Sequence, residues 1–390
     1  MEIRSLSRDY TLARMDRRSA LKALGILAGT VALPSCATRH VTQAATPPPP
    51  QPALLKLQKV NVSPDREIRT VVGLRPFRPS GFVVSTQKFD DKLVVHNYGH
   101  GGGGVTLSWG TSELACQEVD QTDEKNVAVL GCGAVGLATA RLLQERGCSV
   151  TIYAKDLPPN TTSNIAGAQW FPFYVFDSAH TTPAFVQQFV EAAHLANRRF
   201  QIMVGTRYGI QWLPNYWMGD QPIRNHGLLA PDSPINDLVA EKHYLAPSEN
   251  PFPFPTVLQF DTMIIEPNRY LPAVIEDFRI AGGQIRVQEF KSVAELQTLP
   301  QHVIVNCTGL GAKALFGDAE LTPVKGQLTI LLPQPEVDYC TLAGDLYMFP
   351  RTDGILLGGT HEVGVWTLEP NLEAKQRIVA EQAKLFAGMK

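Results

Sequence analysis

The 390-residue sequence has little of what marks several broad classes of protein. Its 35 Lys and Arg nearly balance its 37 Asp and Glu, so no excess of positive charge points to a nucleic-acid partner. The six cysteines form neither a CxxC pair nor a spacing typical of a metal site or a disulfide framework. The sequence has no internal repeat and no apolar run of the ~20 residues that a membrane-spanning helix needs. What remains is a globular composition, 44% hydrophobic, long enough for one large or two medium domains.

The most informative motif in the chain is the glycine-rich run Gly131-Cys132-Gly133-Ala134-Val135-Gly136. Residues 126–130 before it predict a strand, residues 137–146 after it have helical spacing, and residues 149–153 predict a second strand. In such a βαβ unit the first glycine permits a tight turn, the second lets the backbone approach a pyrophosphate, and the third lets helix pack on strand. The N–H groups at the helix start attract the phosphates. This setting predicts an adenine-dinucleotide site, with a glycine turn used only for packing as the alternative.

The first residues of the chain carry signals for export rather than for a fold. Arg17 and Arg18 precede an apolar, Gly- and Ala-rich stretch at 24–33, which is typical of a twin-arginine export signal. The run Leu33-Pro34-Ser35-Cys36 resembles a bacterial lipoprotein box, which implies cleavage before Cys36 and a lipid anchor on it. A plain exported protein with an incidental Cys36 is the alternative. We expect a signal over 1–36, a stiff Pro-rich linker over 37–54, and a location in the periplasm or cell envelope.

Strands and helices alternate along the rest of the chain. Strands are expected at 93–95, 303–307, 328–332 and 355–357, and helices at 182–199, 269–281 and 373–387. The alternation predicts an α/β fold with a Rossmann-type domain, and aromatic strand-rich stretches such as 205–256 predict a second, mixed-sheet α+β domain for the substrate. The ligand is expected where the carboxyl ends of the sheet strands meet that second domain.

Several runs together resemble the D-amino acid oxidase family of FAD flavoproteins. Besides the glycine turn, they are Tyr153–Pro158, Thr161–Ala168, Val305–Gly309, Lys325–Gln327, Leu357–Gly359, Arg75–Pro79 and His96–Gly104. The run His96-Asn97-Tyr98-Gly99 is the most specific of them. The resemblance covers the chain from about Leu55 to Lys390 and implies the two-domain fold of that family.

The order of these runs differs from that of the family, in which the dinucleotide turn lies near the amino end and the Arg-Pro and His-Asn-Tyr-Gly segments lie near the carboxyl end. Here those two segments come first, so the sequence resembles a circular permutant, which exposed and adjacent termini permit. The alternative is that the early segment completes a second copy in a swapped homodimer. The expected parts are a permuted segment with the substrate arginine and flavin glycine loop at 55–118, a linker at 119–125, the FAD-binding βαβ part at 126–180, a substrate-domain part at 181–300, an FAD-domain return strand at 301–325, and substrate-domain strands with the terminal helix at 326–390.

The resemblance implies FAD-dependent oxidative deamination of a D-amino acid. A hydride passes from Cα to the flavin N5, O₂ takes the electrons and becomes H₂O₂, and the imino acid hydrolyses to a 2-oxo acid and ammonia. Because the cofactor carries the difficult chemistry, the protein's task is orientation. That task fits a sequence without an obvious acid–base or nucleophilic constellation. The expected partners are FAD, a D-amino acid and O₂, with no metal.

The same match assigns roles to individual residues. Arg75 is expected to bind the substrate carboxylate through its planar fork, Tyr347 to add its hydroxyl, and the Gly102 carbonyl to accept from the substrate amine. His96 and His100 are expected to be structural and to hold the glycine loop, since hydride transfer needs no such base. Beyond the glycine turn, the residues expected to hold FAD are Gly101, Gly103, Gly104, Thr106, Lys155, Asp156, Thr161, Thr162, Ser163, Gly167, Ala168 and Thr308.

The expected side-chain preference rests on a missing cation. Aspartate-specific members of the family need a second cation, and residues 326–346 contain no Lys or Arg, so neutral or aromatic D-amino acids are favoured. A lid tyrosine of mammalian members has no counterpart at 341–345, which predicts a shorter lid and a more open entrance. The alternatives are a D-aspartate oxidase, a glycine- or sarcosine-type flavin amine oxidase, a non-catalytic ligand-binding lipoprotein on the same fold, and an NAD-dependent dehydrogenase.

Overall fold

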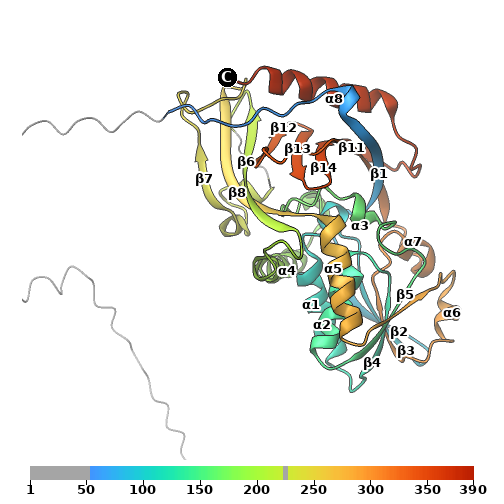
Figure 1. The fold of residues 1–390 in the computed structure, drawn as a ribbon. Helices are drawn as coiled ribbons and strands as arrows, with labels where there is room; N and C mark the ends of the chain where they lie inside the picture. Colours follow the sequence, from blue (N-terminus) through green and yellow to red (C-terminus); the bar gives the residue numbers. More distant parts are fainter. Residues whose placement is uncertain (1–52, 223–226) are drawn as a thin grey trace, which may run out of the picture. The chain divides into compact units, whose positions relative to one another are not determined.

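The structure is a computed structural model that describes residues 53–222 and 227–390. The predicted export signal and Cys36 lie outside the described residues. Residues 51–390 group into one compact unit built on two β-sheets (Figure 1). Among the described helices, none combines the length and the apolar character that crossing a membrane requires.

A six-stranded sheet carries the dinucleotide motif. Its strand order is β2 (Val83–Phe89), β3 (Lys92–Tyr98), β10 (Val303–Asn306), β4 (Asn126–Leu130), β5 (Ser149–Ala154) and β9 (Gln284–Val287). From β3 to β9 the strands are parallel, and β2 is an antiparallel edge. The central strands are short apolar runs because helices cover both faces of the sheet, which leaves no face for polar residues.

Four helices pack together on one face of this sheet (Figure 1). They are α1 (Ser108–Val119), α2 (Ala134–Glu145), α4 (Pro183–Ile202) and α5 (Pro267–Ile280). The short helices α6 (Val293–Leu296) and α7 (Gly311–Phe316) supply Leu296 and Leu315 to a separate cluster on the other face. Helix α1 includes Val119, so the linker expected at 119–125 starts one residue later, because the Val119 side chain is buried in the core with α1.

The second sheet has nine strands. Its order is β1 (Glu67–Phe77), β11 (Thr322–Leu331), β14 (Gly354–Gly358), β13 (Leu346–Arg351), β12 (Cys340–Ala343), β6 (Ile210–Gly219), β8 (Thr256–Ile265) and β7 (Ala240–Tyr244), with β15 (Glu362–Val363) also paired to β11. Helix α8 (Leu372–Ala387) lies along this sheet and buries Ile378, Leu385 and Phe386 in its core (Figure 1).

Helix ends follow local sequence signals. The Thr182 side chain accepts from the Phe185 N–H at the start of α4, and Pro183 occupies the first turn. Helix α5 begins at Pro267 and ends before Gly282, whose φ of +85° favours glycine. The helices predicted at 182–199, 269–281 and 373–387 are therefore confirmed to within a few residues, as are the predicted strands except one. The strand predicted at 328–332 begins earlier, at Thr322 of β11.

The segment before the glycine motif takes part in both sheets. Strand β1 pairs along its whole length with β11, and β3 inserts beside β10 in parallel register. Residues 55–59 lie next to the last residues of the chain, because Lys59 Nζ donates to the Met389 carbonyl at 2.5 Å. Both ends also bond to one loop, the Leu55 N–H to the Glu249 carbonyl and the Lys390 N–H to the Pro251 carbonyl. The early segment is thus an integral part of the described unit rather than an appendage.

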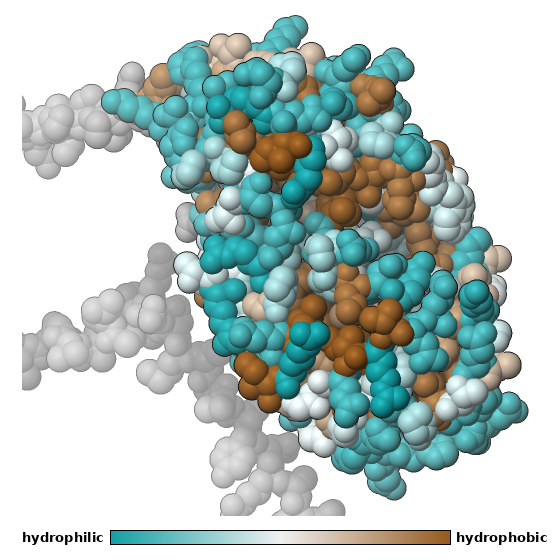
Figure 2. All heavy atoms as spheres, turned by 45° about the vertical axis from the view of Figure 1, so that its right-hand side comes forward, coloured by the Kyte–Doolittle hydropathy of each residue, from teal (hydrophilic) through white to brown (hydrophobic). Residues whose placement is uncertain are grey.

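Figure 2 shows hydrophobic residues gathered around a hollow in the middle of the face that carries β1. A cavity of about 300 Å³ lies between β1, β11 and β14 on one side and α3 (Thr162–Ile165) on the other. Val71, Leu328 and Leu356 line its sheet side, and Asn164 and Ile165 line its α3 side. Helix α3 therefore lies between this cavity and the start of α2, where the Ser163 hydroxyl meets the Ala134 N–H.

Candidate active site

The glycine turn between β4 and α2 is closely packed. Gly131 has φ +105° and donates its N–H to the Tyr153 carbonyl at 2.8 Å, a conformation that a side chain would strain. A methyl group on Gly136 would lie 2.1 Å from the Gly131 carbonyl oxygen, so the helix could not approach the strand this closely with any larger residue. The first and third glycines thus do what the sequence predicted for them.

The start of α2 suits an anionic ligand. Its N-cap residue is Gly133, which has no side chain to cap the helix, and the Ala134 N–H is met by the Ser163 hydroxyl at 2.9 Å. A methyl on Gly133 would lie 3.1 Å from that hydroxyl. A helix start without a capping side chain of its own, next to a serine hydroxyl, fits the pyrophosphate of a dinucleotide such as FAD, which Gly131 to Gly136 and Ser163 would hold.

The strand ends beside this turn carry polar residues for the adenosine part of such a ligand. Lys155 and Asp156 follow β5, are exposed, and lie 3.9 Å apart at Nζ and Oδ2. Glu289 lies equally close to Lys155, so it is a second carboxylate here that sequence reasoning missed. Thr308 follows β10 and is fixed by Asn306, whose Oδ1 accepts from both its N–H and its hydroxyl.

The predicted loop at 161–168 connects the two sheets through α3. The Thr161 hydroxyl donates to Asn164 Oδ1, and a methyl on Gly167 would lie 3.0 Å from the Phe349 ring on β13. Ala168 has φ +58° and its carbonyl accepts from the Ile265 N–H at the end of β8. Thr162 and Ser163 lie on α3, and the Ser163 hydroxyl accepts from the Ala134 N–H at the start of α2.

The glycine loop after β3 forms a 3₁₀ turn at Gly101–Gly103. The Gly102 N–H donates to the Tyr174 carbonyl at 3.0 Å, and a methyl on Gly101 would lie 2.1 Å from the same oxygen. Thr106 is buried and its hydroxyl donates to the Gly103 carbonyl, which fixes the loop from its far end. A methyl on Gly104 would meet nothing closer than 3.8 Å, so this face of the loop is open.

Arg75 and Tyr347 lie together on one face of the nine-stranded sheet, although they are separated by most of the chain. Arg75 is half-buried on β1, and its Nη1 donates to the Thr360 carbonyl at 3.3 Å. Burial raises the pKa of the Tyr347 hydroxyl, and a hydrogen bond and the positive charge of Arg75 lower it in part. Gly326 on β11 makes room for the arginine, because a methyl there would lie 2.3 Å from Arg75 Nη1.

Three aromatic rings frame this arginine and were not predicted. The rings of Phe77 and Tyr174 stack with centroids 4.3 Å apart, and His361 meets Tyr174 edge-on at 3.9 Å. Burial and the charge of Arg75 lower the pKa of His361. Tyr174 has φ +54°, which sets its carbonyl against the glycine loop. Phe77 ends β1, whereas Tyr174 and His361 lie in loops, and no spacing in the sequence relates the three, so sequence reasoning missed them as a group.

The two histidines of the His-Asn-Tyr-Gly run are structural in this arrangement. Burial lowers the pKa of His96 to about 4 and that of His100 to about 3, so both are neutral at pH 7. His100 lies within 2.9 Å of the Thr111 hydroxyl and stacks on Phe82. His96 contacts Gln87 and Asn306 instead of the glycine loop, which corrects its predicted partner.

Comparison with known proteins agrees with this geometry. Residues 126–390 match the family described as "DAO: FAD dependent oxidoreductase". A D-amino-acid oxidase of Streptomyces coelicolor is 30% identical over 275 residues, which cover 69% of this chain and 80% of the relative. A D-aspartate oxidase of Homo sapiens is 29% identical over 265 residues, covering 66% of this chain and 75% of that relative.

A solved structure with a similar fold is the L-alpha-glycerophosphate oxidase of Mycoplasma pneumoniae with FAD bound. It superposes with a TM-score of 0.50 at 15% identity, over 69% of this chain and 80% of that one. The family match begins at the first residue of β4, so the strands β1 to β3 precede it. With a dinucleotide turn, a serine-lined helix start and a family match over the whole carboxyl-terminal part, the chain belongs to the FAD-dependent oxidoreductases of this family.

Proposed function

We propose that the protein catalyses the oxidative deamination of D-amino acids with FAD. The observation that carries the proposal is Arg75 beside the Tyr347 hydroxyl on the sheet face that meets the glycine loop. Bound FAD would supply the chemistry, accepting a hydride from the substrate Cα and passing the electrons to O₂ to give H₂O₂. The imino acid then hydrolyses to a 2-oxo acid and ammonia.

The chain's own residues bind and orient the substrate. The Arg75 guanidinium pairs with the substrate carboxylate through its planar fork, and the Tyr347 hydroxyl donates to the same carboxylate. The carbonyl of Gly102 accepts from the substrate amine. Because the aromatic rings of Phe77 and Tyr174 close one side of the arginine, they exclude water from this ion pair and strengthen it.

The preferred substrates in this proposal have neutral or aromatic side chains. An aspartate side chain needs a second cation, and two described residues near Arg75, Lys325 and His361, do not supply one. Lys325 pairs with Leu74 in register, so its side chain projects from the face of the sheet opposite to that of Arg75. There its Nζ lies 4.0 Å from Glu362 Oε2. Its lowered pKa keeps His361 neutral at pH 7. D-aspartate is the alternative substrate, and the similarity to the human D-aspartate oxidase favours it.

The entrance to the site is proposed to be open. Strands β12 and β13 are joined by the two-residue turn at 344–345, in the region where the sequence predicted a shortened lid. We therefore expect product release to be fast relative to the reductive step. Rapid-mixing measurements that found release far slower than reduction would contradict this expectation.

The function is tested by a peroxide assay over D- and L-amino acids. D-alanine and D-phenylalanine should give H₂O₂, and their L-forms and glycine should not. Turnover of glycine or sarcosine in preference to D-alanine would favour a flavin amine oxidase of that type. A yellow protein that binds D-amino acids without forming peroxide would favour the non-catalytic lipoprotein. A dependence on added nicotinamide cofactor would support the dehydrogenase alternative, which the family match disfavours.

We also propose that the chain is a circular permutant of its family. The support is that β1 forms an edge of the nine-stranded sheet and β3 lies inside the six-stranded sheet. In addition, the family match starts only at residue 126, and Lys59 bonds to the Met389 carbonyl near the end of the chain. A reordered chain, with 53–118 placed after Lys390 through a short linker, should be monomeric and as active as the parent. If the reordered chain were inactive and the parent an obligate dimer, a swapped homodimer would explain the data instead.

Export and anchoring through the first 36 residues are likewise proposed. Replacement of Arg17 and Arg18 by lysine should leave the full chain in the cytoplasm. Replacement of Cys36 by alanine should abolish incorporation of labelled fatty acid and release the protein from the membrane fraction. Unlabelled wild-type protein in the soluble periplasmic fraction would point to the plain exported form.

A further inference from the structure

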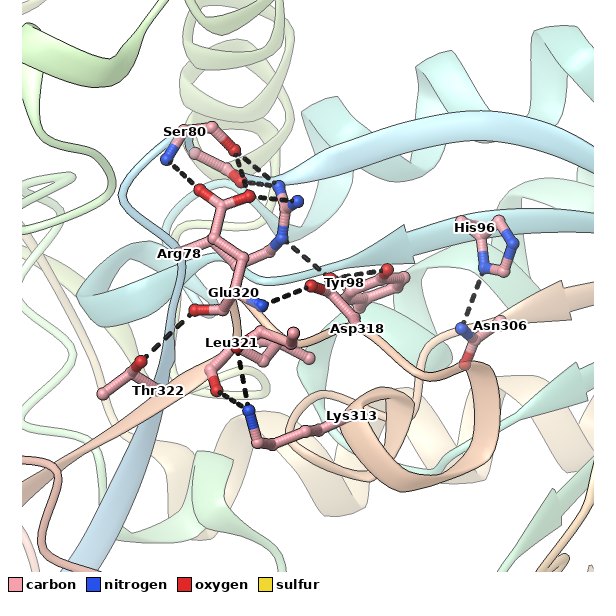
Figure 3. A network of polar contacts seen from close by, with 12 residues as sticks. Arg78, Ser80, His96, Tyr98, Asn306, Lys313, Asp318, Glu320, Leu321 and Thr322 are labelled. Atoms are coloured by element: carbon pink, nitrogen blue, oxygen red, sulfur yellow. Dashed lines mark hydrogen bonds and ion pairs between the residues drawn. The ribbon is translucent and has the colours of Figure 1, made fainter.

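The Arg78 side chain joins its own segment, 78–81, to residues 318–320, which lie far from it in the sequence (Figure 3). Its Nε donates to Asp318 Oδ2 at 2.9 Å, and its Nη2 donates to Glu320 Oε2 at 2.6 Å. Its Nη1 donates to the Ser80 hydroxyl at 2.9 Å and to the Gly81 carbonyl at 2.7 Å. With a side chain only 14% exposed, this guanidinium has nearly all of its hydrogen-bonding capacity in use.

The glycine loop is attached to this cluster at two points. The Tyr98 hydroxyl, at the end of β3, donates to Asp318 Oδ2 at 2.8 Å. The next residue, Gly99, lies against the aliphatic stem of Arg78, because a methyl on it would lie 2.5 Å from Arg78 Cδ. The loop therefore starts between a tyrosine and an arginine that share one carboxylate oxygen.

The substrate arginine is attached to the same cluster through β1. Arg75 precedes Arg78 by three residues, about 10 Å along an extended strand. Between them, Phe77 forms an isolated β-bridge with His100 of the glycine loop. A shift of Arg78 would therefore move the end of β1 and the start of the glycine loop together.

The acidic partner in this cluster is itself fixed. Lys313 Nζ donates to the carbonyls of Ala319 and Leu321, each at 2.9 Å, and so holds the turn that carries Asp318 (Figure 3). Burial raises the pKa of Asp318, but the bonds from Tyr98 and Arg78 more than offset this and hold it below the usual value. The carboxylate is ionised throughout the neutral range.

We infer that Arg78, Asp318 and Tyr98 form a clamp that sets the glycine loop and Arg75 at a fixed separation, and that they are positioning residues for FAD and for the substrate carboxylate. This inference rests on the proposed function. A clamp of this kind differs from a simple stabilising ion pair, because its loss should misplace two binding groups that it does not itself contribute.

The test compares Arg78→Lys with Arg146→Lys in the full chain. Lysine keeps the charge but cannot bridge two carboxylates, a hydroxyl and a carbonyl at once. Arg146 is a matched control: it is 21% exposed, it binds Glu113 and Asp120, and it joins α1 to α2 away from the glycine loop. Both variants should lower the melting temperature to a similar extent.

Binding, rather than stability, distinguishes the two variants. Arg78→Lys should raise the Kd for FAD, measured by quenching of FAD fluorescence, and the Kd for benzoate as a carboxylate probe, measured from the flavin absorbance, by about tenfold each. Arg146→Lys should leave both within about twofold of wild type. Tyr98→Phe removes one hydroxyl from a side chain of the same shape and should raise both Kd values by about threefold. It tests the clamp independently if Arg78→Lys does not fold.

Equal effects of Arg78→Lys and Arg146→Lys, or unchanged Kd values in Arg78→Lys and Tyr98→Phe, would overturn the clamp and leave the proposed function standing. Failure of the wild-type protein to bind FAD or benzoate would instead overturn the proposed function.

Discussion

Gly326→Ala is the most informative single perturbation of the substrate site, because it acts on Arg75 without touching it chemically. The added methyl would lie 2.3 Å from Arg75 Nη1 and 2.6 Å from its Cζ and Nη2. Since non-bonded heavy atoms settle at about 3.5 Å, one of the two groups must move by roughly 1 Å. Strand β11 is paired on both sides, whereas the guanidinium is held by a bond of 3.3 Å to the Thr360 carbonyl and a bond with the Tyr347 hydroxyl, so the flexible guanidinium moves.

The expected loss follows from the carboxylate contact. A charge-assisted hydrogen bond contributes about 1.5–3 kcal/mol, so misplacing the Arg75 fork should lower kcat/KM for D-alanine by about 10- to 150-fold. The Kd for benzoate should rise by a similar factor, because it reports the carboxylate site without turnover. The Kd for FAD should stay within about twofold, because the dinucleotide turn lies on the other sheet.

The matched control is Gly219→Ala at the end of β6 in the same sheet, where the nearest atom to an added methyl is 3.5 Å away. That variant should behave as wild type in every assay. A Gly326→Ala enzyme with wild-type KM and benzoate Kd would refute the placement of Arg75. So would a variant that lost FAD and melted several degrees lower, because the backbone would then have yielded instead of the side chain.

Four further predictions follow from the same geometry. Tyr347→Phe should lower kcat/KM by about fivefold, the cost of one hydroxyl of about 1 kcal/mol, with unchanged FAD binding; a wild-type value would remove the hydroxyl from the site. His361→Arg places a permanent cation beside Arg75 and should raise kcat/KM for D-aspartate relative to D-alanine by about tenfold; an unchanged ratio would show that His361 does not face the substrate side chain. Gly136→Ala should abolish FAD binding and lower the melting temperature, because its methyl would lie 2.1 Å from the Gly131 carbonyl; a yellow, stable variant would contradict the tight turn. His96 and His100 have lowered pKa values in the folded protein, so the unfolded chain binds more protons below about pH 6.5 and stability falls as pH falls. Each histidine should contribute a loss of about 2 kcal/mol in the protein's free energy of unfolding between pH 7 and pH 5. In denaturant melts, His96→Gln should therefore lose about 2 kcal/mol less than wild type over this range.

The sequence predicted those parts of the fold that have a clear local pattern, either a short apolar run or an apolar stripe at helical spacing. The buried strands β4 and β10 are short apolar runs, and α4 carries an apolar stripe between a capping threonine and its end. Strand β2 was missed because it is a polar, mostly exposed edge, and β9 because only its second residue is partly buried. An edge strand needs neither an apolar run nor strict alternation, so its composition resembles that of a loop.

The site divides in a similar way. The glycine turn was predicted from spacing alone, because its neighbours in sequence are its neighbours in space. Arg75 and Tyr347 were found only through the family resemblance, since no local pattern relates residues so far apart. Asp318 was missed for the same reason: it meets Arg78 across 240 positions of chain. The side of the sheet on which Lys325 lies relative to Arg75 is also hidden from the sequence, because β-sheet register decides it.

The central claim is that FAD and a D-amino acid meet beside Arg75, and anaerobic titration of the purified protein tests it most directly. The protein should be yellow as isolated, D-alanine should bleach the flavin absorbance stoichiometrically without air, and admission of air should restore the colour with release of H₂O₂. L-alanine should leave the spectrum unchanged. A colourless preparation that takes up no FAD, or a flavin that D-amino acids fail to bleach, would contradict the account.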